Sequence, residues 1–510
     1  MSSAPSEIPV QLLPLDEHNL ALRANSAPPG WHNPSPTGRY NLVVIGGGTA
    51  GLVAAAGAAG LGARVALVER TLLGGDCLTT GCVPSKALIR SARAAHDARS
   101  GRDFGISAGG VEVDFTEVMT RLRRLRAQIS PHDSAARFRD LGIDVYLGEA
   151  SFIGPTHVRV AGQDLAFARA VIATGGRAAI PDIPGLAEVG YLTNESIFSL
   201  TRRPARLAVI GGGPIGCELA QAFQRLGSRV HLIQSAGRIL PHDDADAAVL
   251  LERAMRADGV SILTSAQVTG ARRESAGRIL AIRSSEGTQE VEVDEILVAA
   301  GRRPNLERLG LDAAGVTFDL QHGVTVDDRL RTSNRRIYAA GDVCSRFKFT
   351  HAADAMARIV LNNALFFGRA SASALTMPWC TYTDPEIAHV GLSQEEALAR
   401  GMAIDTIRVP FHEVDRAILD GEQGGLLTIH LRKGSDRILG ATIVARHAGE
   451  MIAEITLAMT AGLGLRAIGR TIHPYPTQAE AIRKAADQYN RRRLTPFIKQ
   501  VFQRWMQWLR

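Results

Sequence analysis

Residues 42–51 read LVVIGGGTAG, and residues 207–216 repeat the pattern as LAVIGGGPIG. Each copy joins an apolar run to glycines in the spacing G-x-G-x-x-G and then to small residues that begin a helix. This order predicts strand, tight turn and helix, the dinucleotide-binding unit of a parallel α/β fold. The glycines let the backbone approach a pyrophosphate, whose charge the helix N-terminus stabilises. These glycines are Gly46, Gly48 and Gly51 in the first copy and Gly211, Gly213 and Gly216 in the second.

The composition describes a globular protein of several domains. A chain of 510 residues, 45% hydrophobic and 21% charged, is expected to form two to four domains. The N-terminus lacks the pattern of a secretory signal, and the apolar stretch 42–68 fits strand, turn, helix and strand better than a membrane span. The net charge is +7, and six basic but no acidic residues lie in 491–510. The remainder is close to neutral, which argues against a nucleic-acid-binding face.

Two cysteines lie beside the first glycine turn. Residues 74–86 read GGDCLTTGCVPSK, with Cys77 and Cys82 separated by four residues. Two thiols so close to a nucleotide site suggest a pair that opens and closes as a disulfide and exchanges electrons with a cofactor. The chain has five cysteines, too few for a disulfide scaffold. Cys217, Cys344 and Cys380 are expected to be small buried hydrophobic residues.

The cysteine segment resembles the redox-active segment of the flavin- and pyridine-nucleotide-linked disulfide reductases, which include dihydrolipoamide dehydrogenase, glutathione reductase and mercuric reductase. The resemblance covers residues 40–490 and includes RIYAAGD at 336–342 and FTHAA at 349–353. It implies an α/β fold with two Rossmann-like dinucleotide-binding domains, the second inserted in the first, and a C-terminal α+β dimerisation domain. It also implies that Cys82 lies beside the flavin and that Cys77 meets the substrate. Lys86 is expected to pair with Glu218 near the flavin.

The second strand of each glycine unit is expected to end in the residue that contacts a ribose. Glu69 follows Gly51 at the spacing expected for the adenosine half of FAD, where a carboxylate accepts both ribose hydroxyls. The same spacing after Gly216 gives Gln234, whose neutral amide tolerates a 2′-phosphate, with Arg238 nearby. We therefore favour NADPH over NADH. The remaining cofactor-binding residues implied by the resemblance are Thr174, Gly175, Asp342 and Ala352 for FAD and Gly301 for the nicotinamide nucleotide.

One part of the family pattern differs. Disulfide-reducing members carry a histidine before Pro-Thr and a glutamate five residues after that histidine. Here residues 472–480 read IHPYPTQAE, so counting back five residues from Glu480 gives Tyr475. His473 lies two positions early. A tyrosine at this position resembles mercuric reductase. A phenol is a poor base near neutral pH, and a soft Hg(II) ion is expected to favour two cysteine sulfurs as ligands.

The leading interpretation is an FAD-dependent NAD(P)H oxidoreductase of the mercuric reductase type. Cys77 and Cys82 would pass electrons to Hg(II), and no structural metal site is predicted. No cysteine follows Cys380, so the C-terminal cysteine pair of mercuric reductases is missing, and the N-terminal metal-binding domain is missing too. A small disulfide or a quinone therefore remains open as the oxidant. Dihydrolipoamide dehydrogenase is the alternative enzyme, and a non-catalytic, membrane-docked redox sensor is the alternative of another class.

The resemblance and the composition divide the chain into six segments. The ranges are a flexible tail at 1–39, FAD-binding parts at 40–190 and 317–374, an NAD(P)-binding domain at 191–316, an interface domain at 375–490 and a basic amphipathic helix at 491–510. Within the interface domain, antiparallel strands are expected at 426–431 and 438–444, and a helix at 449–461. The resemblance implies a homodimer in which Tyr475 and Glu480 complete the partner's active site.

The end of the chain separates into an apolar and a polar helical face. A helix over 497–510 has two interpretations: it docks on the protein's own dimer, or it lies in an anionic membrane surface. We expect a cytoplasmic protein, with residues 496–510 as a candidate contact with the inner face of the membrane.

Overall fold

The computed structural model describes residues 12–107, 109–274 and 277–510. The chain forms two compact units, Met1–Ser235 with Ala266–Leu375, and Ala236–Ser265 with Thr376–Arg510. Residues 236–265 thus group with the C-terminal part of the chain and not with the rest of the predicted 191–316 domain. The other predicted boundaries remain predictions.

The first glycine unit forms the centre of a mixed sheet in which β1 (Arg39–Ile45) pairs in parallel with both of its neighbours. Strand β1 leads through the glycine turn into helix α2 (Thr49–Gly60) and strand β2 (Val65–Glu69). Leu42 and Val44 pack into one apolar cluster, and Val43 and Ile45 into another. Because β1 is buried on both faces, its sequence is a continuous apolar run instead of an alternating one. This confirms strand, turn, helix and strand at residues 42–68.

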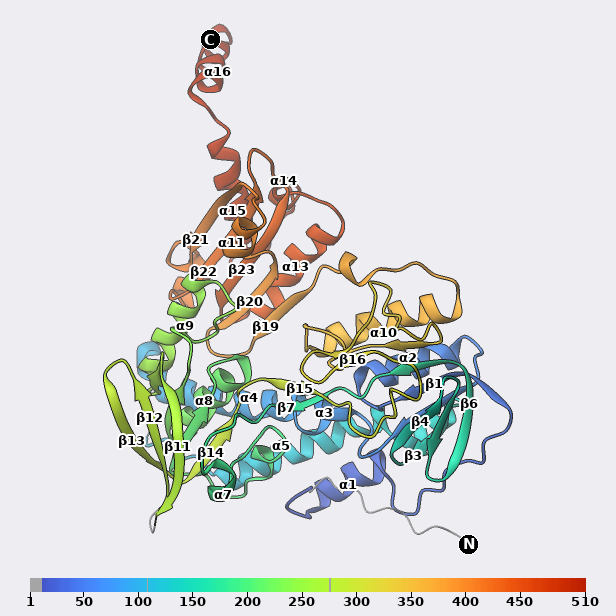
Figure 1. Ribbon diagram of the computed structural model, residues 1–510. Coiled ribbons are helices and arrows are strands. Elements are labelled where there is room, and N and C mark those ends of the chain that lie inside the picture. The colour runs from blue at the N-terminus through green and yellow to red at the C-terminus, as the bar shows by residue number, and fades with distance from the viewer. Residues whose placement is uncertain (1–11, 108, 275–276) are drawn as a thin grey trace. The chain divides into compact units, whose positions relative to one another are not determined.

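Further strands extend this sheet on both sides of β1. The order is β3-β2-β1-β6-β5-β4, and β18 pairs in parallel with β6. The added strands are β3 (Asp144–Leu147), β4 (Ala150–Gly154), β5 (His157–Val160), β6 (Gln163–Ile172) and β18 (Ile337–Ala339). Helix α10 (Thr350–Leu365) packs beside α2 (Figure 1), and both contribute to one cluster with the sheet. Residues on either side of the second glycine unit therefore build one domain core, as the predicted insertion requires.

The second glycine unit repeats the arrangement. Strand β8 (Arg206–Ile210) pairs in parallel with β9 (Arg229–Ile233) and β14 (Glu295–Val298), and helix α8 (Pro214–Arg225) follows its turn. An antiparallel meander of β11 (Gln267–Glu274), β12 (Gly277–Ser284) and β13 (Gly287–Val293) precedes β14. A short antiparallel pair, β7 (Gly176–Ala178) with β15 (Arg302–Pro304), joins the segments that follow β6 and β14.

The second compact unit contains an antiparallel sheet. Its strand order is β19-β20-β23-β22-β21. The strands are β19 (Pro378–Thr381), β20 (Glu386–Gly391), β21 (Ile404–Pro410), β22 (Leu426–Arg432) and β23 (Ile438–Ala445). Helices α13 (Ala448–Thr460), α14 (Leu465–Gly469) and α15 (Glu480–Arg492) pack against it around an apolar core. The predicted β22–β23 pair and the helix at 449–461 are confirmed.

The expectation of a flexible tail at 1–39 needs correction within its described part. Helix α1 (Glu17–Ser26) is capped by Asp16, whose carboxylate accepts a hydrogen bond from the Asn19 N–H at 2.9 Å. Leu22 is fully buried in a cluster with Leu72 and Leu78. A few apolar residues are enough to dock this segment, because they pack against Leu72 and Leu78 of the folded domain. The proline content and weak periodicity of the segment gave no sign of this contact.

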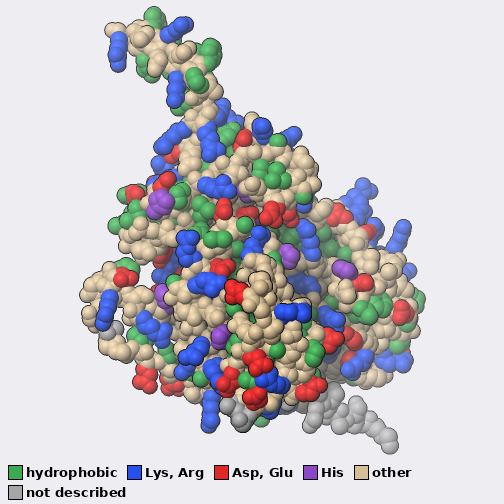
Figure 2. Space-filling model, turned by 60° about the vertical axis from the view of Figure 1, so that its left-hand side comes forward, with side chains coloured by type: hydrophobic (Ala, Val, Ile, Leu, Met, Phe, Trp, Pro, Cys, Tyr) green, Lys and Arg blue, Asp and Glu red, His purple; other side chains and the backbone are tan. Residues whose placement is uncertain are grey.

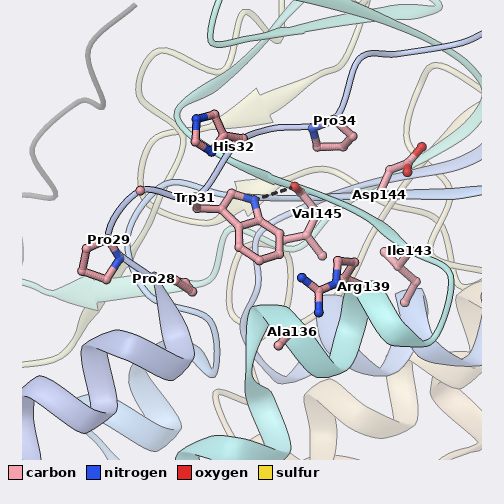
Figure 3. A pocket seen from close by; sticks show the side chains of 11 residues that line it. Pro28, Pro29, Trp31, His32, Pro34, Ala136, Arg139, Ile143, Asp144 and Val145 are labelled. Atoms are coloured by element: carbon pink, nitrogen blue, oxygen red, sulfur yellow. Dashed lines mark hydrogen bonds between the residues drawn. The ribbon is translucent and has the colours of Figure 1, made fainter.

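The chain after α1 is also held in place. Figure 3 shows the Trp31 indole N–H donating to the Val145 carbonyl oxygen, at 3.1 Å, with Arg139 beside the ring. These residues line an open cavity of about 530 Å³ that contains none of the predicted site residues. The cavity therefore lies where the N-terminal segment packs against residues 136–145.

The C-terminal segment forms two helices instead of one. Arg491 and Arg492 end α15, and helix α16 (Pro496–Trp508) follows after a short break (Figure 1). No residue of α16 is buried. Among the described residues, no helix is both long and apolar enough to cross a membrane.

Candidate functional site

The two glycine turns have matching geometry. Gly46 and Gly211 both have φ of +111°, and a Cβ on either would lie 2.2 or 2.4 Å from a backbone carbonyl oxygen. A Cβ on Gly51 would lie 1.8 Å from the Gly46 oxygen, and a Cβ on Gly216 would lie 1.9 Å from the Gly211 oxygen. Only glycine fits these positions, because helix and strand approach each other closely at the turn.

The predicted ribose-binding residues brace these turns. The Gly47 N–H donates to Glu69 Oε2 at 2.6 Å, and the Gly212 N–H donates to Gln234 Oε1 at 3.0 Å. The other Glu69 oxygen accepts from the N–H and hydroxyl of Thr71 at 2.7 and 2.8 Å. Both side chains therefore lie at the end of the second strand, beside the phosphate-binding turn, as their spacing predicted.

The cysteine segment crosses from a short helix to a long one. Cys77 lies in α3 (Gly75–Thr79), and Cys82 is the first residue of α4 (Cys82–Arg99). A hydrogen bond from the Cys77 thiol, together with Thr350 and the charge of Lys86, lowers the pKa of Cys82 to about 6, although burial opposes this. The shared proton and burial raise the pKa of Cys77 well above its usual value. The reduced pair thus holds one proton, with Cys82 as the thiolate.

Thr350 connects both sulfurs and was missed in the sequence. Its hydroxyl donates to the Cys77 sulfur at 3.2 Å and lies 3.3 Å from the Cys82 sulfur. Thr350 is the first residue of α10, the helix predicted to begin at FTHAA, so a hydroxyl at this helix start was the available signal. The hydroxyl stabilises negative charge on the pair.

The predicted pair of Lys86 and Glu218 is present. Lys86 Nζ donates to Glu218 Oε2 at 2.8 Å, and the Glu218 side chain is almost fully buried. Lys86 lies one helical turn after Cys82 on α4, and Glu218 lies on α8. The pair links the cysteine helix to the helix of the second glycine unit and holds a positive charge near Cys82.

Arg302 joins the cysteine segment to the predicted flavin aspartate. Its guanidinium forms ion pairs with Asp76, next to Cys77, and with Asp342, where Nε lies 3.0 Å from Oδ2. Burial raises the pKa of Asp342, and the positive charge of Arg302 opposes that shift. Lys348 Nζ donates to the Arg302 carbonyl oxygen at 3.0 Å. The sequence pattern indicated Asp342 but not Arg302 or Lys348, because these contacts join distant segments.

The other residues predicted to bind FAD lie in the same compact unit. The Thr174 hydroxyl donates to the Asn305 carbonyl oxygen at 2.8 Å, and the Asn305 N–H donates to the Gly175 oxygen at 3.0 Å. Ala352 is buried in the first turn of α10. The α10 N-terminus and the Thr174–Gly175 segment therefore belong to the same compact unit as the cysteine pair.

These residues fit a dinucleotide in each glycine unit. A Cβ added to Gly175, Gly213 or Gly301 would meet no protein atom within 4 Å, so open space adjoins the backbone there. Each turn precedes a helix whose first N–H groups can bind phosphate. A carboxylate ends the strand of one unit and an amide ends that of the other, which suits an unphosphorylated ribose in the first and tolerates a phosphorylated one in the second.

Arg238 is engaged in a structural role. Its Nη2 donates to the carbonyl oxygens of Pro241 and Asp243 at 3.1 and 3.0 Å. These contacts stiffen its loop within the second compact unit. A role for Arg238 in binding a 2′-phosphate stays a prediction, as do the roles of the other cofactor residues.

The Tyr475 region lies in the second compact unit. The Tyr475 hydroxyl donates to Asp415 Oδ2 at 3.0 Å, and this bond together with the aspartate charge raises the pKa of the phenol. Glu480 Oε2 is buried without a hydrogen-bond partner among the described residues. The tyrosine therefore pairs with Asp415, which the sequence did not indicate, and not with Glu480.

His473 is occupied by other contacts. Its Nε2 lies 3.0 Å from a Glu454 carboxylate oxygen, and its Nδ1 lies 3.1 Å from the Thr471 carbonyl oxygen. Both ring nitrogens therefore have hydrogen-bond partners within the chain. This supports the structural interpretation of His473.

Comparisons with known families agree with the geometry. Residues 40–357 match the model of the pyridine nucleotide-disulphide oxidoreductases, and residues 377–486 match the dimerisation domain of the same family. A mercuric reductase of Staphylococcus aureus is 36% identical over 88% of this chain and 82% of its own length. A dihydrolipoyl dehydrogenase of Thermus scotoductus is 34% identical over 88% of this chain and 97% of its own length.

A solved structure gives the same result. The Cu(II) complex of the HOCl-induced flavoprotein disulfide reductase RclA from Escherichia coli has a TM-score of 0.78 and 28% identity. The match covers 87% of this chain and 98% of that one. It agrees with the α/β fold and the C-terminal interface domain described above.

Proposed function

Because the chain belongs to the pyridine nucleotide-disulphide oxidoreductase family, we propose that it reduces a thiophilic metal ion with electrons from NADPH. The chain is an oxidoreductase that uses FAD and NAD(P)H, as this family does. When bound, FAD supplies two-electron transfer between the nicotinamide and the cysteine pair. The metal ion, and not a resident metal, is the substrate.

The observation that carries the proposal is Tyr475 bound to Asp415 at 3.0 Å. Reduction of a disulfide releases a thiolate that needs a proton, which an imidazole supplies well near neutral pH. A phenol whose pKa is raised holds its proton and remains a hydrogen-bond donor. Reduction of a metal ion held by Cys77 and Cys82 frees only the protein's own thiolates and no substrate thiolate, so no general acid is needed to protonate a departing product.

The cysteine pair is suited to bind a soft ion. Cys82 is the thiolate, and Cys77 loses the shared proton when the ion binds, because only thiolates ligate metals well. The Thr350 hydroxyl and the Lys86 charge stabilise the negative charge of the two thiolates. Two electrons reduce the M(II) ion to M(0), and NADPH is oxidised to NADP⁺ and a proton.

The relatives support two substrate classes. The mercuric reductase and the Cu(II) complex of RclA favour a thiophilic metal ion. The dihydrolipoyl dehydrogenase supports a second candidate, a dithiol–disulfide substrate. Position 475 carries a tyrosine and the His473 ring nitrogens contact Glu454 and Thr471, which makes this the weaker candidate.

The test follows NADPH and NADH oxidation with Hg(II) plus excess thiol and, in parallel, with lipoamide. We expect Hg(II)-dependent turnover that is lost in Cys82→Ala and retained in the control Cys380→Ala. Turnover with lipoamide alone would reject the metal proposal. Flavin reduction by NADPH without multiple turnover on either substrate would instead support the non-catalytic redox sensor.

A substitution at Tyr475 separates the two substrate classes. Tyr475→His supplies the missing imidazole, so we expect lipoamide turnover to rise and Hg(II) turnover to fall. Tyr475→Phe is the matched control, since it removes only the hydroxyl. Unchanged Hg(II) and lipoamide rates in both variants would show that position 475 does not select the substrate.

The dimerisation domain supports a homodimer. We propose that Tyr475 and Glu480 of one subunit complete the active site of the partner, and that the enzyme acts in the cytoplasm. Mixed dimers of Cys82→Ala and Tyr475→His subunits test the arrangement. They contain one site with both substitutions and one with neither, so half of the wild-type Hg(II) activity is expected.

A further inference from the structure

The terminal helix α16 has one apolar face that nothing in the described chain covers. Its apolar side chains fall on one half of the helix circumference at 100° per residue. They are Phe497, Ile498, Val501, Phe502, Trp505, Met506, Trp508 and the following Leu509. Trp508 is 75% exposed and Phe497 is 72% exposed. The described residues form no side-chain hydrogen bond or ion pair between α16 and another element.

Basic residues border this apolar face on both sides. Arg504 lies at one edge, and Lys499 and Arg510 lie at the other. In Figure 2 the terminal helix carries apolar and basic side chains and no acidic ones. Long basic side chains beside an apolar face can extend to lipid headgroups while the face enters the acyl boundary.

The charge distribution favours a lipid surface over a second copy of the chain as the partner of α16. Six of the 58 basic residues and none of the 51 acidic residues lie in 491–510, so the rest of the protein is nearly neutral. A nearly neutral partner subunit offers little attraction to a cationic helix. An anionic bilayer attracts each of these charges and also receives the apolar face.

We propose that α16 is an interfacial helix that binds the protein to anionic lipid membranes. The apolar face enters the bilayer surface and the basic edges contact anionic headgroups. Its length and amphipathic pattern suit a helix lying in the plane of the membrane.

The test is co-sedimentation of the full-length holoenzyme with vesicles. Vesicles of phosphatidylglycerol mixed with phosphatidylcholine are compared with vesicles of phosphatidylcholine alone. We expect about tenfold tighter binding to the anionic vesicles. Trp505→Gln with Trp508→Gln is expected to weaken binding by at least about tenfold, because it removes the aromatic anchors. NADPH oxidation should not change.

Two matched pairs isolate the causes. Gln503→Ser with Gln507→Ser changes the polar face and is expected to leave binding within about twofold. Lys499→Gln with Arg504→Gln is expected to remove the preference for anionic lipid. Equal binding to both vesicle types, or binding unaffected by the tryptophan pair, would overturn the proposal. Loss of the dimer on deletion of 496–510, measured by light scattering, would assign the helix to the second subunit and also overturn it.

Discussion

The two ends of the chain lie outside the family matches, at 40–357 and 377–486, and their helices have opposite environments. Helix α1 has a weak apolar pattern, yet Leu22 is fully buried. Helix α16 has a clear apolar face, yet Trp508 is largely exposed. Amphipathic pattern alone therefore does not decide whether a terminal helix docks. A complementary surface on the folded core does.

Buried polar contacts distinguish the N-terminal helix further. Arg126 on α5 (Phe115–Ile129) donates to the Asn19 side-chain oxygen at 2.8 Å and to the Thr79 carbonyl oxygen at 2.6 Å. Thr79 ends α3, the helix that contains Cys77. The N-terminal segment is thus connected through one guanidinium to the redox-active segment, whereas α16 lacks a contact of this kind among the described residues.

The largest effect is expected from the apolar anchor of α1. Leu22→Ala should lower the free energy of unfolding by about 3 kcal/mol, because it leaves a cavity in a closed cluster. The counterpart Phe502→Ala in α16 should change it by less than about 0.5 kcal/mol. Urea unfolding of both variants measures the difference. Equal destabilisation would mean that α16 is docked in solution.

Arg126→Ala should cost about 2 kcal/mol, because the Thr79 and Asn19 oxygens lose their donor inside the protein. The exposed Arg124 on the same helix provides the control Arg124→Ala, for which no change is expected. Burial lowers the pKa of Arg126 to about 10, so keeping the guanidinium charged inside the protein costs desolvation free energy. Unfolding that requires more denaturant in Arg126→Ala than in the wild type would show that this cost dominates.

A smaller effect is expected from the N-cap residues of α1 and α16. Asp16→Ala removes the cap of α1, and an ion pair to Arg123, at a cost of about 1 kcal/mol in global unfolding. Thr495→Ala removes the cap of α16, where the hydroxyl accepts from the Ile498 N–H at 3.4 Å. This second change should reduce helicity by circular dichroism without shifting the unfolding midpoint. A shift in that midpoint would contradict the independence of α16.

The smallest effect concerns thiol reactivity. The Cys82 thiolate, with its pKa of about 6, should lose reactivity toward iodoacetamide in the reduced protein as the pH falls through about 6. Arg126→Ala loosens the segment that holds Cys77 against Cys82, so the midpoint should move up toward the ordinary thiol value. Deletion of 496–510 should not move it. A midpoint unchanged in Arg126→Ala would show that the Arg126 contact with Thr79 does not influence the cysteine pair.

The sequence predicted those parts of the site that depend on local patterns. Glycine spacing located both turns and the braces Glu69 and Gln234, and the family motifs located the Lys86–Glu218 pair. It did not predict Thr350 between the sulfurs or Arg302 between Asp76 and Asp342. The contacts of Thr350 with the sulfurs and of Arg302 with Asp76 join residues more than two hundred positions apart, and no periodicity in the sequence indicates such proximity.

The amino-acid sequence by itself determined the paired glycine units, the cysteine pair and the strands and helices around them, because each follows from a short-range rule of spacing or burial. Tertiary structure alone decided that Tyr475 pairs with Asp415, that His473 is occupied, and that α1 is docked while α16 is not. Those outcomes depend on which complementary groups the fold brings together, and that is a property of the packed chain.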